Sequence, residues 1–394
     1  MAKYLLRRIL WSTVTLFLFV SLIFFLVQVI IPHDFTVQFA LGQTQAQREA
    51  LQHELGLDLP LWKQYLRWMR NFVSGSLGES FYGYTVEQVL KTTVPLSLFI
   101  FLIGTALAFT IGLWLGKITG WRGSGPLAST LTFGGIALYT TFPPWLAFLM
   151  THFISRRFSV TRNAFARSDG LSGLSSEIWG ADNISPSQIA WRITLVIIAI
   201  AFVLFLLNLL LRRLTRRSLP GFVLLLLTGL GVYLLFEPMG IKIQAVDLVQ
   251  RATLPVLTYT LLSFGETMLI MRTSMTDTLK QEYVYAARAK GLPNRMVRDK
   301  HAARNALLPV VGRLIISLPY LLTGMVIIED VLVWPGVGEQ LWTSLYQQDM
   351  PVVMVLFLMI GIFSLIARLF VDVAVAILDP RIRFDGTASE PAQL

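Results

Sequence analysis

Few residues in this chain have the types and spacing that chemistry requires. The sequence has no cysteine, so thiol nucleophiles, thiolate metal sites and disulfides are excluded. The four histidines, His33, His53, His152 and His301, are far apart and lack metal-ligand spacing. No GxxxxGKS or GxxxxGKT pattern occurs, so any ATP hydrolysis must belong to another chain. The sequence therefore predicts no catalytic residue, no metal site and no cofactor bound by this chain.

One carboxylate lies within a strongly apolar stretch. Glu266 is deep in the run from Ala252 to Met271, where an ionised side chain needs a partner or water. It either lines a translocation path or is a buried, hydrogen-bonded packing residue. The second interpretation is favoured, and the sequence names no partner. Arg313 and Arg368 also fall inside apolar runs, but within about two turns of their ends, so we expect both to snorkel to the headgroups.

The segment from Arg272 to Arg304 is polar, basic and patterned. Tyr285 to Lys290 is an Ala-rich run that predicts a helix, and Gly291 can end it in a left-handed conformation. Pro293 suits the first turn of a second helix that continues to Arg304. A solvated charged loop is the simpler interpretation. The adjacent alanines before the glycine favour another, in which one small flat face approaches a second surface closely.

The composition places these residues in a membrane protein. Hydrophobic residues make up 55% of the chain and charged residues only 14%, and the mean hydropathy is +0.64. A soluble core of this size needs more polar surface than that, whereas a bilayer solvates apolar side chains. The 33 Lys and Arg exceed the 23 Asp and Glu, but most flank hydrophobic runs. That placement is typical of membrane orientation and indicates no nucleic-acid partner.

Hydrophobic periodicity predicts about eight membrane spans. They are expected at Ile9 to Ile31, Leu96 to Gly116, Leu127 to Phe153, Ile193 to Leu211, Leu219 to Phe236, Ala252 to Met271, Leu307 to Ile328 and Val352 to Val371. A cytoplasmic N-terminus places the basic clusters inside, as the positive-inside rule requires. The exception is the loop from Ser155 to Arg192, which is placed outside although it contains Arg156, Arg157, Arg162 and Arg167.

A segment of about 60 residues separates the first two spans. Apolar positions between Trp62 and Phe72 recur at three- and four-residue steps, which predicts an amphipathic helix on the outer membrane surface. A docking platform for a partner protein is the alternative, and the two interpretations are compatible. Gln45 to Leu55 belongs to the same segment.

Several short motifs resemble the dipeptide and oligopeptide permease family of ABC importers. They are Tyr283 to Leu292 with His301 to Pro309, Arg7 and Arg8, Glu54 to Asp58, Gly75 to Ser80, Glu329 with Trp334 to Gly338, Asp349 to Pro351, and Leu378 to Arg383. The first pair is similar to that family's EAA loop, with Tyr285 where Glu is often found. Each motif is weak alone, but their order and spacing cover nearly the whole chain.

The resemblance implies a type I importer-like, all-α membrane fold and a transport subunit without enzymatic activity. It implies that the loop couples to a cytoplasmic ATPase through Tyr285, Ala286, Ala287, Arg288, Lys290, Gly291, Leu292 and Arg295. An extracytoplasmic gate or docking role is expected for Trp334, Pro335, Gly336, Gly338 and Asp349. The implied partners are a second homologous permease, two ATPase subunits that bind ATP and Mg, and an extracytoplasmic binding protein, at a bacterial or archaeal inner membrane with both termini cytoplasmic.

The chain departs from the usual six-span pattern by an apparent extra hairpin at 193–236, interpreted as lipid-facing or as a site for an extra subunit. The expected parts are 1–31, 32–95, 96–153, 154–192, 193–236, 237–371 with the EAA-like loop at 272–306, and a cytoplasmic tail at 372–394. Peptides are the expected cargo, with oligosaccharides or a nickel chelate as alternatives. A secondary transporter is the distant alternative, because only Glu266 resembles an ion-coupling site.

Overall fold

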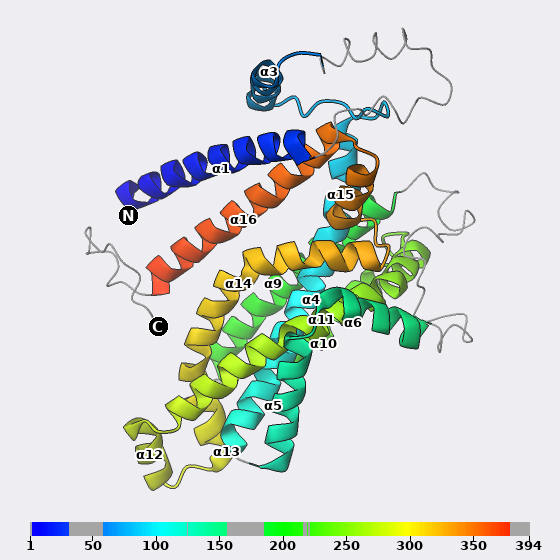
Figure 1. The fold of residues 1–394 in the computed structure, drawn as a ribbon. Coiled ribbons are helices and arrows are strands. Elements are labelled where there is room, and N and C mark those ends of the chain that lie inside the picture. Colours follow the sequence, from blue (N-terminus) through cyan, green and yellow to red (C-terminus); the bar gives the residue numbers. More distant parts are fainter. Residues whose placement is uncertain are drawn as a thin grey trace. The chain divides into compact units, whose positions relative to one another are not determined.

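The computed structural model describes residues 2–30, 58–123, 125–155, 185–215, 219 and 221–378, and these form helices joined by short turns (Figure 1). The chain divides into two compact units. Unit 1 is residues 1–91, 340–369 and 379–394, and unit 2 is residues 92–339 and 370–378. Predictions for Gln45 to Leu55, for most of the loop at 154–192 and for the tail after residue 378 lie outside the described residues.

In unit 1, the predicted amphipathic helix is confirmed as α3 (Leu61–Val73), which follows Pro60. Its aromatic side packs against α1 (Ala2–Ile30). The Phe24 ring lies 5.3 Å from that of Tyr65 and 5.7 Å from that of Trp68. The Tyr65 hydroxyl is 2.7 Å from that of Ser21. The first span, rather than the membrane surface alone, therefore receives part of the apolar side of α3.

Unit 1 also contains most of α15 (Val337–Tyr346) and of α16 (Met350–Leu378). Gly361 of α16 lets the Phe19 ring of α1 approach, because a Cβ at Gly361 would lie 2.7 Å from that ring. The first and last spans are thus adjacent within this unit.

The centre of unit 2 is the contact between α4 (Val86–Arg122) and α11 (Lys242–Thr278). Gly112, Gly116 and Gly120 recur every four residues of α4, so they form one stripe on that helix. A Cβ at Gly112 would lie 2.7 Å from the carbonyl oxygen of Phe264, and one at Gly116 would lie 2.6 Å from Cβ of Met271. Small residues here allow close helix approach, as is common between membrane helices.

The predicted span from Leu127 to Phe153 is not one straight helix. It is divided into α5 (Pro126–Tyr139) and α6 (Pro143–Leu149), which continues as the π-helical turn η2 (Met150–Ser155). The two parts are bent by 106°. Pro143 and Pro144 supply no backbone N–H and therefore start a new helix rather than continue the old one. A bent pair of this kind forms one broken span or a re-entrant loop, so the predicted membrane span over this stretch stays a prediction.

The extra hairpin is formed by α9 (Pro186–Thr215) and α10 (Gly221–Leu235). Its N-terminal residues Ile189 and Ile193 are buried in the core of unit 2, whereas Phe202 is 59% exposed. The Asn208 side chain accepts a hydrogen bond from the Leu219 backbone N–H at 2.8 Å. Its polar group therefore closes the turn of the hairpin.

Five helices in the described residues are long and apolar enough to cross a membrane, or six with the bent pair. α10 has 15 residues, about 22 Å, which falls short of a hydrocarbon layer of roughly 30 Å. The 29-residue α14 (Ala303–Val331) covers another predicted span, although side chains at 315–324 are outside the described part. The count of about eight spans stays a prediction, because these figures cover only the described residues. The all-helical membrane class is confirmed.

Candidate functional site

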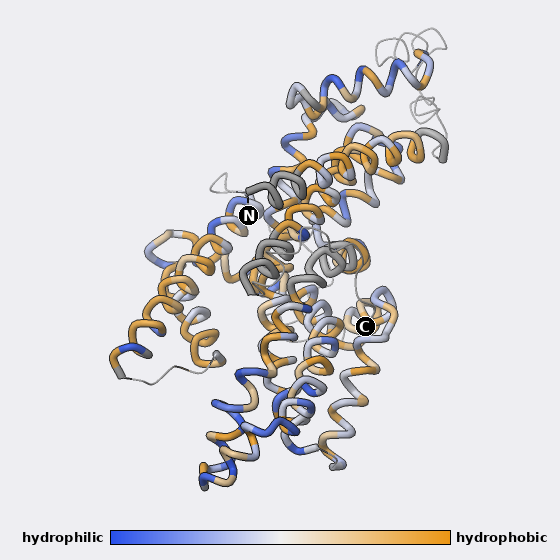
Figure 2. Tube along the Cα trace, turned by 90° about the vertical axis from the view of Figure 1, so that its left-hand side faces the viewer, coloured by the Kyte–Doolittle hydropathy of each residue, from blue (hydrophilic) through white to orange (hydrophobic). Residues whose placement is uncertain are grey.

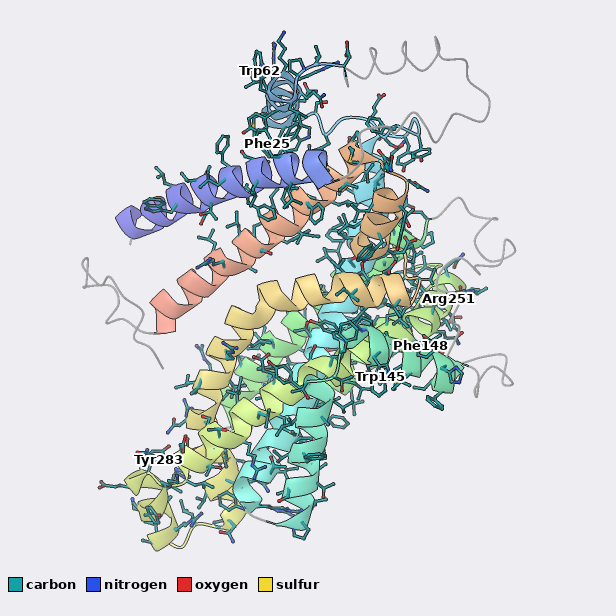
Figure 3. All side chains as sticks on the ribbon, in the orientation of Figure 1. Phe25, Trp62, Trp145, Phe148, Arg251 and Tyr283 are labelled. Atoms are coloured by element: carbon teal, nitrogen blue, oxygen red, sulfur yellow. The ribbon has the colours of Figure 1, made fainter. Side chains whose placement is uncertain are left out.

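The predicted short helix of the basic segment is α12 (Glu282–Ala289), between α11 and α14. It ends where predicted, since Gly291 has φ of +72°. The backbone N–H groups of Lys290 and Gly291 donate to the carbonyls of Ala286 and Arg288. Glycine adopts this left-handed conformation without the steric cost of a Cβ. This end of unit 2 is the hydrophilic one in Figure 2, and Tyr283 marks α12 in Figure 3.

The inner face of α12 anchors it to the rest of unit 2. Val284 and Ala287 are 0% and 5% exposed. They lie in one apolar cluster with Met275 of α11 and with Val297 and Ala302 beyond the turn. Burial of these side chains away from water is the main force that holds the loop in place. The loop is therefore a packed element, and the simple solvated-loop interpretation is excluded for it.

The outer face of α12 is exposed and basic. Tyr285 is 57% exposed, and Ala286, Arg288 and Lys290 are exposed as well. The guanidinium of Arg288 lies 5.5 Å from the centre of the Trp121 ring, which fixes its direction. The two alanines do not form the single small face that we expected. Neighbouring helix positions point about 100° apart, so Ala286 faces out while Ala287 faces in.

The second helix differs from the prediction. Pro293 is the residue before it rather than in its first turn, and the helix α13 (Asn294–Met296) has three residues. A π-helical turn, η3 (Val297–Ala302), follows and leads into α14. Leu292 is half-buried and Arg295 is exposed. The predicted long helix to Arg304 is thus interrupted.

An ion-pair network connects the π-helical turn η3 to α4. The Lys117 ammonium lies 3.0 Å from Oδ1 of Asp299, and the Arg298 guanidinium donates to both carboxylate oxygens at 3.0 and 2.8 Å. Hydrogen bonding from Arg298, with Lys117 contributing as well, holds the pKa of Asp299 below its usual value. Sequence analysis assigned no partner to Lys117, because the two residues are far apart in the chain.

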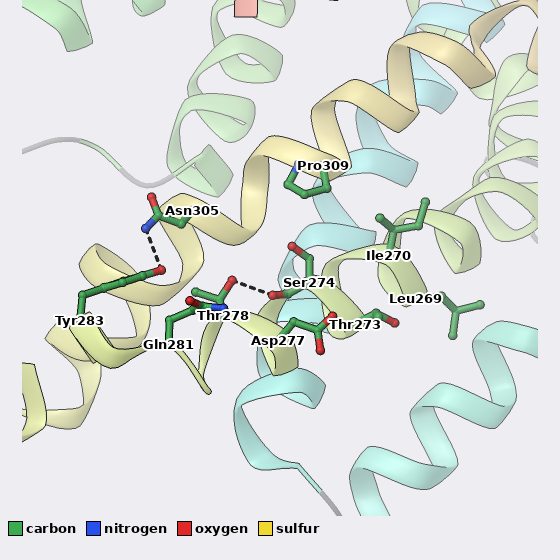
Figure 4. A pocket seen from close by; sticks show the side chains of 10 residues that line it. All are labelled: Leu269, Ile270, Thr273, Ser274, Asp277, Thr278, Gln281, Tyr283, Asn305 and Pro309. Atoms are coloured by element: carbon green, nitrogen blue, oxygen red, sulfur yellow. Dashed lines mark hydrogen bonds between the residues drawn. The ribbon is translucent and has the colours of Figure 1, made fainter. Parts of the chain in front are cut away.

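A groove of about 680 Å³ opens beside α12, between α11 and the start of α14 (Figure 4). It is lined by Leu269, Ile270, Thr273, Ser274, Asp277, Thr278, Gln281, Tyr283, Asn305 and Pro309. Asn305 donates to the Tyr283 hydroxyl at 2.7 Å, and Ser274 donates to the Ala306 carbonyl at 2.8 Å. These bonds fix α11, α12 and α14 relative to one another on the two sides of the groove.

Glu266 has a partner that the sequence did not reveal. Its Oε1 accepts a hydrogen bond at 3.0 Å from Nε of Arg313 on α14. The side chains are 18% and 53% exposed, respectively. The snorkelling interpretation of Arg313 is therefore incomplete, because this guanidinium is held by a carboxylate on the neighbouring helix.

The residues of the predicted gate or docking region are largely internal. Trp334 is fully buried and donates its indole N–H to the Leu96 carbonyl at 3.3 Å. Gly336 and Gly338 leave room for Glu329 and for the α14 backbone. The buried Glu329 accepts the Gly338 N–H at 2.7 Å, and Pro335 is half-buried. These residues shape a tight turn rather than an exposed surface.

Asp349 is likewise buried, within unit 1. It accepts hydrogen bonds from the Ser80 hydroxyl, from the Phe81 backbone N–H at 3.2 Å and from the Tyr84 hydroxyl at 3.2 Å. Burial raises the pKa of Asp349, and the donated hydrogen bonds oppose that shift. The carboxylate therefore joins the segment before α4 to the start of α16.

A buried ion pair near the start of α11 was not singled out by sequence analysis. Nε of Arg251 lies 2.9 Å from Oδ2 of Asp247, with side-chain exposures of 1% and 8%. The four-residue spacing of opposite charges was the available signal. Among the described residues, no group of three His, Cys, Asp or Glu side chains could hold a metal ion.

Comparisons with known proteins agree with the motifs. The model for binding-protein-dependent transport system inner membrane components matches residues 214–384, and the model for the N-terminal part of such components matches residues 1–84. A Brucella suis protein named as a peptide permease is 31% identical over 391 residues, 97% of this chain and 99% of that protein.

Two further relatives align over similar lengths. The oligopeptide transport system permease protein AppB of Bacillus subtilis is 26% identical over 98% of this chain and 100% of its own length. The dipeptide transport system permease protein DppB of Escherichia coli K12 is 26% identical over 97% and 99%. The resemblance indicated by the sequence motifs is confirmed, and the chain belongs to the family of binding-protein-dependent transport system inner membrane components.

Proposed function

We propose that this chain is the permease subunit of an ATP-driven importer of di- or oligopeptides. The observation that carries the proposal is α12, a short helix that is anchored by Val284 and Ala287 and presents an exposed basic face. The printed names of the relatives, which are peptide permeases, support peptides as cargo. Oligosaccharide or nickel-chelate uptake has no such support.

In this proposal, two cytoplasmic ATPase subunits bind ATP and Mg and contact α12 at Tyr285, Ala286, Arg288 and Lys290. Exposed cations at such a rim favour an acidic groove and steer assembly more than they add affinity. Ala287, Gly291 and Leu292 act indirectly by holding the helix. Arg295, exposed on α13, extends the contact.

The same anchoring makes α12 a suitable coupling element. Its inner face is packed on α11 and beside α14, so a displacement of α12 must be shared by those helices. ATP-driven closure of the ATPases would then change the arrangement of the spans by rigid-body motion. A second permease completes the path, and an extracytoplasmic binding protein delivers the cargo. Both termini are proposed to be cytoplasmic, in the plasma membrane of a bacterium or archaeon.

The Trp334 to Gly338 turn and Asp349 keep a gating role in this proposal, but through their internal contacts. Trp334 and Glu329 hold the turn rigidly. The turn can therefore close or open the translocation path only by moving together with the helices that it joins. The chain itself supplies no catalytic group.

Copurification tests the proposal. The tagged wild-type chain is expected to copurify with ATPase subunits and a second permease. The purified complex is expected to import peptide when it is reconstituted in proteoliposomes. Ala286→Glu places a carboxylate on the exposed basic face and is expected to reduce recovered ATPase at least tenfold. Glu87→Gln, an equally exposed change at the start of α4, is the matched control and should leave recovery unchanged. Full uptake activity from the chain without any ATPase would disprove the proposal.

A further inference from the structure

The Glu266–Arg313 ion pair lies where lipid would be expected. Glu266 is six residues before Arg272 in α11, which places it about 9 Å further along the helix into the apolar run. Its partner Arg313 is 53% exposed on the surface of this chain. A half-exposed guanidinium that is held by a carboxylate and faces hydrocarbon is unfavourable, because charged groups are poorly solvated there. This side of α11 and α14 therefore faces water or protein rather than acyl chains.

The opposite side of α11 is already occupied. The glycine stripe of α4 packs on Phe264, Met271 and Met275, and Gly265 lies against Gly135 of α5. Glu266, Thr273 and Asp277 are separated by seven and eleven residues, so they share one helix face to within about 20°. Thr273 and Asp277 are exposed. The face of α11 that its neighbours leave uncovered thus carries these polar side chains beside the apolar Ile270, which lies about 40° from Glu266.

The groove joins this stripe to a matching row on α14. Asn305, Pro309 and Arg313 recur every four residues and lie on the same side of that helix. Asn305 and Pro309 line the groove, and Arg313 is one further turn along. Figure 4 shows the groove residues of the two helices facing each other. The groove thus has polar side chains set among the apolar Leu269, Ile270 and Pro309, and the Glu266–Arg313 pair lies about one turn beyond it.

We propose that the Glu266–Arg313 pair and this groove form a peptide site within the permease, in which Glu266 binds the free α-ammonium and Arg313 the free α-carboxylate. The inference rests on the proposed function and adds to it the part of the cargo that the permease itself recognises. A zwitterion can replace both partners of the pair at once. A ligand of single charge would displace one partner and leave the other, Glu266 or Arg313, without its counter-charge, which weakens binding.

The affinity of the site for a peptide should therefore depend on both free termini of the peptide, on the amino terminus through Glu266 and on the carboxyl terminus through Arg313. Arg313 can bind a carboxylate with two parallel hydrogen bonds because its guanidinium is planar. The polar row below the pair supplies Thr273, Asp277 and Asn305 for the peptide groups. The side chains of the bound peptide would lie in the open part of the groove. The site is therefore expected to accept peptides of different sequence.

Equilibrium binding to the purified permease–ATPase complex, without binding protein or nucleotide, tests the site. The probe is labelled trialanine, in competition with N-acetyl-trialanine and with trialanine amide. The wild type is expected to bind free trialanine at least tenfold more tightly than either blocked form. Glu266→Gln should remove the preference for a free amino terminus only, and Arg313→Gln the preference for a free carboxylate only.

Two further variants keep the outcome decisive. Lys91→Gln, which breaks the exposed Glu87–Lys91 pair, is the matched control and should change neither preference. The doubly substituted Glu266→Arg, Arg313→Glu chain restores a pair with exchanged charges and should retain both preferences. If the single variants fail to assemble, this exchanged chain alone decides, since loss of either preference in it contradicts the site.

The site and the proposed function fail in different ways. Wild-type complex that imports peptide in proteoliposomes but shows no terminus-dependent binding would overturn the site and leave the function intact. Absence of peptide import by the complete wild-type complex would contradict the function itself.

Discussion

Gly112 of α4 lies directly against the backbone of Phe264 in α11: a Cβ added to Gly112 would stand 2.7 Å from the Phe264 carbonyl oxygen. The added Cβ would be bonded to the backbone of α4, and the carbonyl oxygen is part of the backbone of α11, so neither could move away without a shift of its helix. The two helices are therefore held at a separation that only glycine permits at this point.

Gly112→Leu is expected to force α4 and α11 apart and to lower the free energy of unfolding by about 1–3 kcal/mol or more, the usual cost of overpacking. Thermal unfolding of the purified chain in detergent measures it. Gly134→Ala, where an added Cβ meets nothing within 4 Å, is the control and should be neutral or slightly stabilising. Equal stability of the two variants would contradict close contact at Gly112.

Gly291 requires its backbone conformation rather than its size. With φ of +72° and open space around an added Cβ, Gly291→Ala should cost about 1 kcal/mol from backbone strain alone. Gly291→Asn should recover part of it, because Asn tolerates this region better. Hydrogen exchange of residues 282–292 and peptide-stimulated ATP hydrolysis of the complex should both change in that order.

The control for Gly291 is Gly125→Ala. Gly125 has φ of −160° and equally open surroundings, so alanine there should be tolerated. Identical effects at the two glycines would show that side-chain volume, and not the left-handed turn, is what the position restricts.

Asp247 is expected to be one of the most sensitive residues of α11. Asp247→Asn removes the charge opposite Arg251, whose side chain is 1% exposed. Loss of the charged partner from a buried ion pair typically costs about 3–5 kcal/mol. Expression level and unfolding midpoint should fall sharply. The exposed pair Lys242–Glu237 provides the comparison, since Glu237→Gln there should change stability by less than about 0.5 kcal/mol.

The ion pairs of Asp299 with Arg298 and Lys117, here called the Asp299 clamp, make the stability of the fold depend on pH in a defined direction. The folded state holds the pKa of Asp299 low through Arg298 and Lys117, so the carboxylate adds stability above its unfolded pKa of about 3.9. That contribution is lost as the pH falls through the lower, folded value. Asp299→Asn should therefore be less stable than wild type near pH 6, and the difference should vanish in acid.

The expected size is modest, about 0.2–1 kcal/mol, because the Asp299 carboxylate is partly exposed and screened by solvent. Unfolding midpoints of both proteins from pH 2.5 to 7 measure it. Asp277→Asn removes the same charge from a pair at 3.7 Å with 65% exposure and serves as the reference. A difference that grows in acid would contradict the clamp.

The sequence by itself determined the class of the protein and the place of the short helix in its basic segment. Long apolar runs can be stable only in lipid, and the Gly291 turn depends on local backbone preference, so neither needs information from distant residues. The order of the short motifs along the chain was enough to indicate the family. Helix α12 followed from its Ala-rich run before Gly291, and the amphipathic helix α3 followed from the periodicity of its apolar residues.

Only the tertiary structure decided which residues meet. Glu266 and Arg313 are 47 positions apart, and Lys117 and Asp299 are farther, so no local pattern could pair them. Ala286 and Ala287 are chemically the same, yet packing against Val297 and Ala302 buries one and leaves the other exposed. The bend before Pro143 also has a local cause, but its angle depends on the helices that α5 and α6 pack against. Contacts between distant segments are set by packing, and packing is a property of the folded chain.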